Sequence, residues 1–434
     1  WNFDNRYNLQ ANFRADAFDS SKLSKQARWG FFPSVSASWN ISNEPFFRNH
    51  VDRSKFSTLR LRASWGINGN VNVLSDYRYA TSITPSTSSG YDFLTGSQGS
   101  TIGALVSSVL PNPELRWEES RQIDFGLDAR FFGDRLTFTA DYYSKNTDGL
   151  LTTSIPPLVT GSASTYVNAG IVHNEGLELE LGWKDTIGDF SYGINGNIAT
   201  LKNMVTKGPD GGRISGYQPN GLVPLTYFEE GHPIWYIWGY TTDHIDENGR
   251  AYFKTADGGV TDTPTTDDTG EIGNGIPKLT YGLTLTAAWK GLDLTVFGTG
   301  AYDYDLILVA IRPDIPTNNR LAYFYENAGK TLPSPQNQIN QEALFLQSDM
   351  LVFDASYFKI KQIQLGYSLP KKLLNKLSIG SLRAYVSLDD FFTFTKYPGF
   401  DPETRSSTSG SQMAVDQVQY PIAKRVSLGL NLSF

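Results

Sequence analysis

The dominant pattern of the chain is an alternation of apolar and polar residues with a period of two, repeated along all 434 residues. The last ten residues show it clearly, because every second position is apolar: Val426, Leu428, Leu430, Leu432 and Phe434. Successive side chains of a β-strand point to opposite faces of the sheet. The alternation therefore predicts strands that have one apolar face and one polar face.

The same alternation predicts about twelve strands along the chain. They lie at residues 6–18, 30–42, 56–67, 117–132, 134–147, 174–184, 189–201, 278–290, 291–303, 355–369, 381–394 and 422–434. Between Ile360 and Ile363 the parity slips by one residue, which predicts a β-bulge there.

The connections between these strands alternate in length. The compact ones lie at 42–55, 133–134, 185–189, 290–291 and 370–380, and the long ones at 68–116, 148–173, 202–277, 304–354 and 395–421. Short periplasmic turns and long extracellular loops are typical of bacterial outer-membrane β-barrels. A β-sandwich also alternates apolar and polar residues, but its connections do not sort by length in this way.

The polar face of the predicted strands carries full charges. They are Arg60, Arg62, Asp124, Asp128, Arg130, Glu178, Glu180 and Arg383. A water-filled lumen accommodates such charges, whereas the dry core of a sandwich does not. The other interpretation is an ordinary solvent-exposed face of a soluble sheet. With the loop pattern, we predict an all-β fold, a transmembrane antiparallel β-barrel.

Composition does not oppose this prediction. The chain is 40% hydrophobic with a mean hydropathy of -0.32, yet a barrel strand needs apolar residues only at alternate positions. No window approaches the ~18 consecutive apolar residues of a transmembrane helix. The chain has no Cys, which excludes disulfides and thiol catalysis. With a net charge of -7 and no basic stripe, nucleic acid is not an expected partner.

Seven segments in succession resemble motifs of one known family, the SusC/RagA family of TonB-linked outer-membrane transporters. They are RWGFFPSVS at 28–36, LRLRASWG at 59–66, NPELRWE at 112–118, NEGLEL at 174–179, IGNGIPK at 272–278, SYFKIK and LGYSLP within 356–370, and FTFTKY with DPE within 392–403. The resemblance covers nearly the whole chain.

The resemblance implies a barrel of about 22 strands with an N-terminal plug. On this basis, residues 1–434 are expected to be the C-terminal portion of a TonB-dependent receptor β-barrel, some 12–14 strands, without the plug and the N-terminal strands. Expected partners are a SusD-like surface lipoprotein, the missing N-terminal barrel and plug, the TonB complex acting on the plug, and outer-membrane lipids. The expected cargo is glycans or oligopeptides, and the expected location is the bacterial outer membrane.

Two alternatives of other classes stay open. One is a porin or another barrel that is not energised, which has no plug or TonB partner. The other is a secreted β-sandwich that binds glycans, which dissolves without detergent. Residues that carry catalysis are not evident, because the chain has neither a nucleophile elbow nor a phosphate-binding glycine loop. We therefore expect no enzyme activity and no cofactor.

Calcium is the one metal for which the sequence offers candidates, Asp257 and Asp262. They lie in an Asp- and Gly-rich stretch, where the family often carries a segment like an EF-hand. The liganding pattern is eroded, and no glutamate stands at the spacing of a bidentate ligand.

Four aromatic residues between 235 and 240 are the candidates for contact with a ligand or with the lid protein: Trp235, Tyr236, Trp238 and Tyr240. Their rings are suited to stacking on sugars, but packing of the long loop on itself or against the lid is the favoured interpretation. A second short signal lies at the C-terminus. The alternating strand that ends at Phe434, with Leu430 and Leu432, resembles the signal that the barrel-assembly machinery reads.

Overall fold

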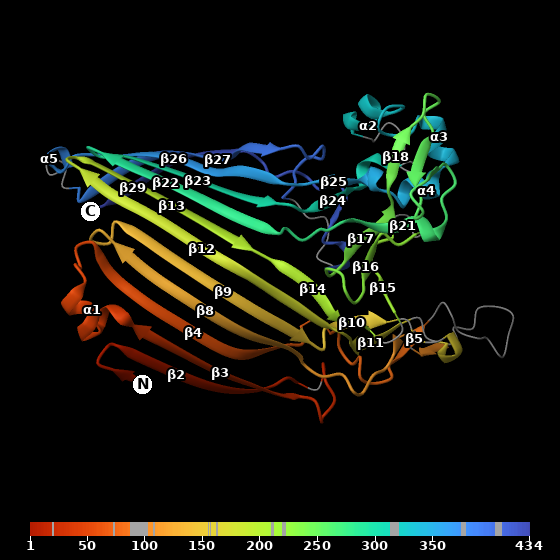
Figure 1. Cartoon of the computed structure of the whole chain (residues 1–434), viewed down its shortest axis with the longest axis horizontal. Helices are drawn as coiled ribbons and strands as arrows, with labels where there is room; N and C mark the ends of the chain where they lie inside the picture. The colour runs from red at the N-terminus through yellow and green to blue at the C-terminus, as the bar shows by residue number, and fades with distance from the viewer. Residues whose placement is uncertain are drawn as a thin grey trace.

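The computed structural model describes residues 1–19, 21–72, 74–86, 103–106, 109–154, 156, 158–161, 164–209, 212–218, 223–312, 321–374, 379–403 and 410–434. They form one long, curved antiparallel sheet, with a layer of smaller elements at one end of its strands (Figure 1).

The main sheet contains all twelve predicted strands. They are β2 (Tyr7–Ala17), β3 (Trp29–Asn40), β4 (Phe56–Asn70), β8 (Glu118–Phe131), β9 (Leu136–Asp148), β12 (Ile171–Ile187), β13 (Phe190–Thr200), β22 (Leu279–Trp289), β23 (Leu292–Tyr302), β26 (Tyr357–Ser368), β27 (Ser381–Thr395) and β29 (Arg425–Ser433). Each strand pairs with the next one in this series. Two short strands extend the sheet: β1 (Asn2–Phe3) pairs with β2, and β14 (Lys202–Lys207) pairs with β12.

The predicted bulge in β26 is confirmed. The pairing of β26 with β27 shifts register between Ile360 and Gln362, and its pairing with β23 shifts opposite the same point. The shift lets Lys361 and Gln362 face the same side of the sheet, which explains the slip in the hydrophobic pattern.

The short connections gather at one end of the strands, which we call the turn end. Lys290 and Gly291 form the two-residue turn between β22 and β23, with φ of 48° and 91°. Positive φ at both central residues is what a type I′ hairpin turn requires. The helices α1 (Pro45–His50) and α5 (Lys371–Leu374) lie in longer turns at the same end, and both chain termini lie there too (Figure 1).

The two faces of the sheet are chemically opposite. One row of neighbouring residues crosses six strands on the outer face: Trp39, Leu61, Leu127, Ala140, Leu179 and Ile198. The next row crosses the same strands on the inner face: Ser38, Arg62, Gly126, Asp141, Glu178 and Ala199. Leu61, Leu179 and Ile198 are 39–45% exposed. An uncovered apolar face of this size is suited to lipid.

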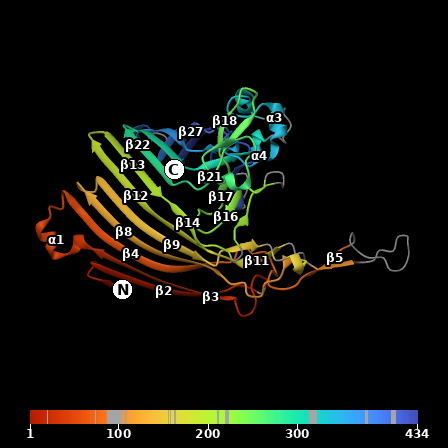
Figure 2. The same cartoon turned by 45° about the vertical axis from the view of Figure 1, so that its right-hand side comes forward.

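Within the described residues, the pairing path begins at β1 and ends at β29, and no pairing joins the two ends. The sheet therefore forms a trough, with β2 and β3 at one side and β27 at the other (Figure 2).

The opposite end of the strands, the loop end, carries a compact unit that we call the cap. It contains β15 (Ile214–Ser215), β16 (Thr226–Phe228), β17 (Tyr236–Tyr240), β18 (Thr242–Ile245), β19 (Ala251–Lys254), β20 (Val260–Thr261), β21 (Thr269–Gly273), β24 (Asp305–Leu308), β25 (Val352–Asp354), β28 (Val415–Asp416), α2 (Ala322–Asn327), α3 (Pro335–Asn340) and α4 (Glu342–Leu346). Its core is the largest group of buried apolar side chains in the described residues, and includes Ile237, Phe253, Ile307, Phe324 and Phe345.

A second, smaller core lies beneath the loops that follow the first strands. Leu23, Phe32, Leu115 and Trp117 are buried there. Near it are β5 (Ile83–Ser86), β6 (Gly103–Val106), β7 (Val109–Leu110), β10 (Leu151–Ser154) and β11 (Ser164–Asn168). The alternation of apolar residues did not predict these short strands.

No helix among the described residues is long and apolar enough to cross a membrane.

The two-faced sheet makes a prediction at consecutive residues of β13. Ile198→Arg places a charge on the lipid-facing side and is expected to destabilise the full-length protein by about 2–4 kcal/mol in phospholipid vesicles. Asn197→Arg, one residue earlier and on the inner face opposite Glu180, is expected to change stability by less than about 1 kcal/mol. Denaturant unfolding measures both. Equal losses in the two variants would contradict the assignment of the faces.

Candidate functional site

The inner wall carries a network of four charged side chains on three neighbouring strands. Asp128 of β8 accepts from Arg60 at 2.7 Å and from Arg62 at 2.9 Å, both on β4. Arg62 also reaches Asp141 of β9 at 2.9 Å. Because the two arginines balance the two aspartates, the network is strongly polar but carries no net charge.

Gly126 makes this network possible. It lies between Arg62 and Asp141 in the inner row. A Cβ atom at position 126 would lie 2.2 Å from Asp141 Oδ1 and 2.6 Å from Arg62 Cζ. Any larger residue would occupy the space through which the guanidinium crosses β8.

A cavity of about 640 Å³ lies beside the network, on the inner side of the first four strands. Besides the charged residues, it is lined by neutral polar side chains, among them Asn8, Gln10, Ser36 and Ser38. Amides and hydroxyls both donate and accept hydrogen bonds. This wall is therefore suited to water and to polar, uncharged solutes.

In the cap, an aromatic layer covers one face of the small sheet formed by β16, β17 and β21. Tyr227 and Tyr236 are direct neighbours across the two strands, and Trp238 follows on the same face. The ring centroids are 6.3 Å apart for the first pair and 5.9 Å for Tyr236 and Trp238. The layer is one continuous aromatic surface.

Two basic side chains lie on this aromatic layer. The guanidinium of Arg213 lies 4.0 Å from the ring centroid of Tyr227 and 5.7 Å from that of Trp238. His232 stacks on Tyr236 with centroids 4.2 Å apart, and its Nδ1 lies 2.8 Å from Glu271. Cation–π and stacking contacts of this kind hold such groups over an aromatic face.

The hydroxyl of Tyr236 donates to Glu229 at 2.5 Å. Burial, together with the negative charge of Glu229, raises the pKa of the Tyr236 hydroxyl well above its usual range. Tyr236 therefore stays protonated and serves as a donor at any physiological pH.

The four aromatic candidates are brought together, but they are not equally accessible. Trp235, Tyr236 and Tyr240 are buried at 9%, 0% and 5% exposure, and only Trp238 is half-buried. Trp235 packs on Phe228, on the other face of the small sheet. The rings therefore largely fill the cap, and of the four only Trp238 reaches its surface.

Sequence reasoning missed Arg213, Tyr227 and His232, which complete the aromatic layer. They lie on segments that are separated along the chain, and each residue alone resembles an ordinary loop residue. The structure brings them together through the pairing of β16 with β17.

The calcium candidates already have partners of their own. Asp257 accepts from Thr255 Oγ1 and from the backbone of Gly259, and Asp262 pairs with Arg250 at 2.8 Å. In the part of the chain that the structure describes, no three His, Cys, Asp or Glu residues stand close enough to hold a metal ion together.

The C-terminal candidates lie at the last strand of the sheet. Leu430 and Leu432 of β29 pair with Ala384 and Leu382 of β27. Leu430, Leu432 and Phe434 are 72%, 48% and 91% exposed, on the outer side. The predicted role in barrel assembly stays a prediction.

A comparison with known families gives one match that covers most of the chain. Residues 1–387 match the family described as "TonB dependent receptor-like, beta-barrel". The chain belongs to this family. The predicted transmembrane antiparallel β-barrel and the outer-membrane location are therefore confirmed, and the sheet is part of the wall of a TonB-dependent receptor.

Individual relatives place this TonB-dependent receptor among the SusC/RagA type. It is 29% identical to TonB-dependent receptor P3 of Formosa agariphila in an alignment of 451 positions, which covers 97% of this chain and 44% of that protein. It is 28% identical to TonB-dependent receptor SusC of Bacteroides thetaiotaomicron, over 99% of this chain and 42% of that protein.

Two solved structures are similar over the entire chain. The RagAB peptide importer in its closed-closed state superimposes with a TM-score of 0.80 at 26% identity, over 100% of this chain and 46% of that one. The open-open state gives 0.78 at 25% identity, over 100% and 45%. The resemblance to the SusC/RagA family is thus confirmed. The chain spans less than half the length of these relatives.

The inner-wall network makes a prediction at Gly126. In the whole receptor, Gly126→Val is expected to lower the free energy of unfolding by about 1–3 kcal/mol, because the new side chain displaces Arg62 from Asp141. Gly196→Val is the matched control in β13, where a Cβ meets only the Gly282 carbonyl oxygen at 3.8 Å, and should change stability by less than about 0.5 kcal/mol. Denaturant unfolding compares them, and the interpretation fails if both behave alike.

Proposed function

We propose that residues 1–434 are the C-terminal part of the barrel of a SusC-like, energy-coupled importer that takes up glycans or oligopeptides together with a SusD-like surface lipoprotein. The observation that carries the proposal is a TonB-dependent receptor wall with a lipid-type outer face, a self-neutralised polar inner face and a cap over its loop end. The chain forms the wall and the cap, and chemistry on the cargo is not part of its role.

The open sheet supports the part of the proposal that concerns further strands. In lipid, an unpaired strand edge leaves backbone groups without hydrogen bonds, so spanning sheets close into barrels. The path from β1 to β29 is not closed within the described residues. Relatives more than twice as long as this chain have the length to supply the remaining strands, and also the plug through which TonB acts.

The wall chemistry supports a polar cargo without a strong net charge. Near the cavity, each charged side chain of the network has a partner of opposite sign. The rest of the lining combines amide and hydroxyl groups with a few apolar residues and with Asp124, which accepts a hydrogen bond from Ser64. Such a surface offers many individually weak hydrogen bonds and no strong field of one sign. Sugars and peptide backbones both match it.

The cap supports contact with a lid protein or with cargo at its surface. The exposed Arg213, with His232 and Trp238, forms a mixed aromatic and polar surface on the aromatic layer. Arginine and aromatic residues are enriched in protein interfaces, and aromatic faces also pack on sugars. We propose Trp238 as the contact residue among the four candidates, with Tyr236, whose ring packs edge-on against it, holding it in place.

Isolation of the complete receptor from outer membranes tests the proposed partners. An affinity tag inserted after Gly258 lies in an exposed turn where no neighbour stands within 4 Å of a Cβ. After mild detergent extraction, mass spectrometry is expected to find a surface lipoprotein at near-equal amounts. A receptor that elutes without any lipoprotein, under conditions that keep the barrel folded, would overturn the two-protein proposal.

Removal of the half-buried ring of Trp238 tests the contact surface. Trp238→Ala is expected to weaken binding of the co-purified lipoprotein or of cargo about tenfold or more, as hot-spot aromatics do. Trp29→Ala removes a ring that is 60% exposed at the loop end of β3, away from the cap, and should leave binding unchanged. Affinity is measured by titration of purified receptor. Equal effects of the two substitutions would argue against a contact at Trp238.

A further inference from the structure

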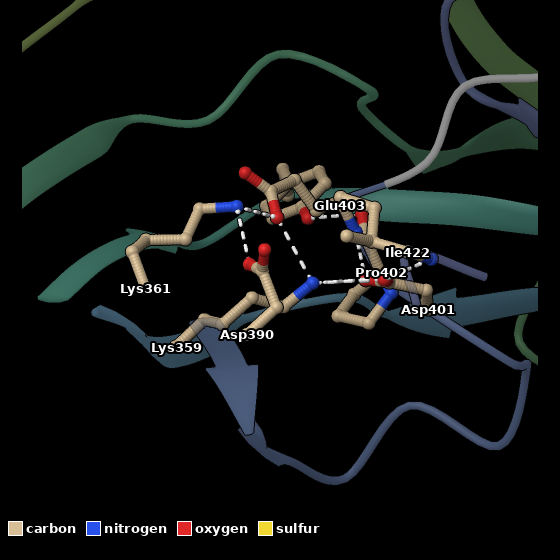
Figure 3. Close-up of polar contacts among 8 residues, drawn as sticks. Lys359, Lys361, Asp390, Asp401, Pro402, Glu403 and Ile422 are labelled. Atoms are coloured by element: carbon tan, nitrogen blue, oxygen red, sulfur yellow. Dashed lines mark hydrogen bonds and ion pairs between the residues drawn. The ribbon is translucent and has the colours of Figure 1, made fainter. Parts of the chain in front are cut away.

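The most deeply buried positive charge in the described residues is the ammonium group of Lys359, on β26 just before the bulge. Its side chain is 2% exposed. Lys359 Nζ lies 2.8 Å from both carboxylate oxygens of Asp401 and 2.9 Å from Glu403 (Figure 3). A buried ammonium is stable only with close counter-charges, because its desolvation is unfavourable.

A second lysine joins the same carboxylates to the neighbouring strand. Lys361 Nζ lies 2.6 Å from Glu403 and 3.1 Å from Asp390 of β27. Lys361 stands at the bulge, where it alone opposes Asp390 and Phe391. Asp390 has φ of 56°, a left-handed conformation that aspartate tolerates better than most residues. The bulge is therefore the place where two lysines and Asp390 converge.

The other two carboxylates belong to a different segment. Asp401 and Glu403 lie in the connection from β27 to β29, residues 396–424, which we call the terminal loop. Asp401 also accepts hydrogen bonds from the backbone N–H groups of Glu403 at 3.1 Å and of Ile422 at 3.4 Å. Asp401 thus joins the two ends of the terminal loop to each other and to the wall.

The terminal loop is bonded to the cap as well. The hydroxyl of Tyr304 donates to the Pro402 carbonyl at 2.9 Å, and Thr226 donates to the Ser411 carbonyl at 2.8 Å. Its strand β28, which is also one of the strands of the cap, pairs in parallel with β24. Contacts therefore connect the wall to the terminal loop, and the terminal loop to the cap.

A hydrogen bond within the terminal loop keeps its two halves together. The Tyr397 hydroxyl donates to Asp416 at 2.8 Å. Burial, and the negative charge of Asp416, raise the pKa of Tyr397 well above its usual range. The donor is therefore present at all physiological pH values.

The cluster is too well paired to serve as a site for a free ion. Each lysine contacts two carboxylates, and Glu403 is shared between them. By contrast, the pair Lys278–Asp303, at the same end of the wall, is 2.9 Å long but 63% and 50% exposed. Exposed pairs of that kind contribute little to stability.

We infer that the cluster of Lys359, Lys361, Asp390, Asp401 and Glu403 is a positioning device: it fixes the terminal loop, and through it the cap, to the C-terminal strands of the wall. The cap thereby moves with β26 and β27 as one body, and any opening of the pore mouth takes place at other contacts. This inference goes beyond the proposed import function and does not depend on the identity of the cargo.

Hydrogen exchange of the full-length receptor, measured by mass spectrometry, tests the inference. Asp401→Asn leaves Lys359 without its main counter-charge, and exchange at 304–308 and 410–418 is expected to rise about 100-fold. Exchange in β22 and β23 should stay unchanged. Lys278→Gln breaks the exposed pair and is the matched control, with no expected effect on exchange at 410–418.

A second variant keeps the test decisive if Asp401→Asn fails to fold. The side chain of Lys361 is 22% exposed, so Lys361→Gln leaves a smaller uncompensated charge. It is expected to raise exchange in the same segments by about tenfold. The inference is wrong if exchange there, in either folded variant, is no faster than in Lys278→Gln.

Discussion

The backbone hydrogen bonds of the main sheet are the constraint on which the rest of this structure depends. Inside a lipid layer, every N–H and C=O group needs a partner within the protein, and only helices and closed barrels satisfy this. The chain satisfies this requirement with twelve long strands, each paired with the next long strand along the sequence. Once the ladder is set, its period of two assigns each residue to lipid or lumen.

The inner face carries a charged network whose positive and negative side chains balance one another, so the network adds polarity without a strong electric field of one sign. Arg62 crosses the space above Gly126 to reach Asp141, while Asp128 holds both arginines. The charges hydrate the lumen, yet they neutralise one another across neighbouring strands. A wall of this kind offers hydrogen-bonding groups to water and to polar solutes, while the charges of the network cancel one another.

The loop end is stabilised in a different way from the wall. It lies outside the lipid, so burial of apolar side chains away from water stabilises it. Long connections fold into a cap with its own core, and aromatic residues supply much of that core. Lys359 and Lys361, at the bulge of β26, then hold the terminal loop, which contacts the cap, against the wall. The bulge and Asp390 with its positive φ are local irregularities in an otherwise regular ladder, and they lie where the two parts meet.

The sequence by itself determined the twelve long strands, their two faces and the bulge, because alternation and turn residues act locally. It also carried the family motifs. Only the tertiary structure decided the cap, since its strands pair segments far apart in the chain, as β24 does with β28. The same holds for Arg213 over Tyr227 and for Lys359 with Asp401. No local pattern records such contacts, because burial and charge pairing arise only after distant segments have packed together.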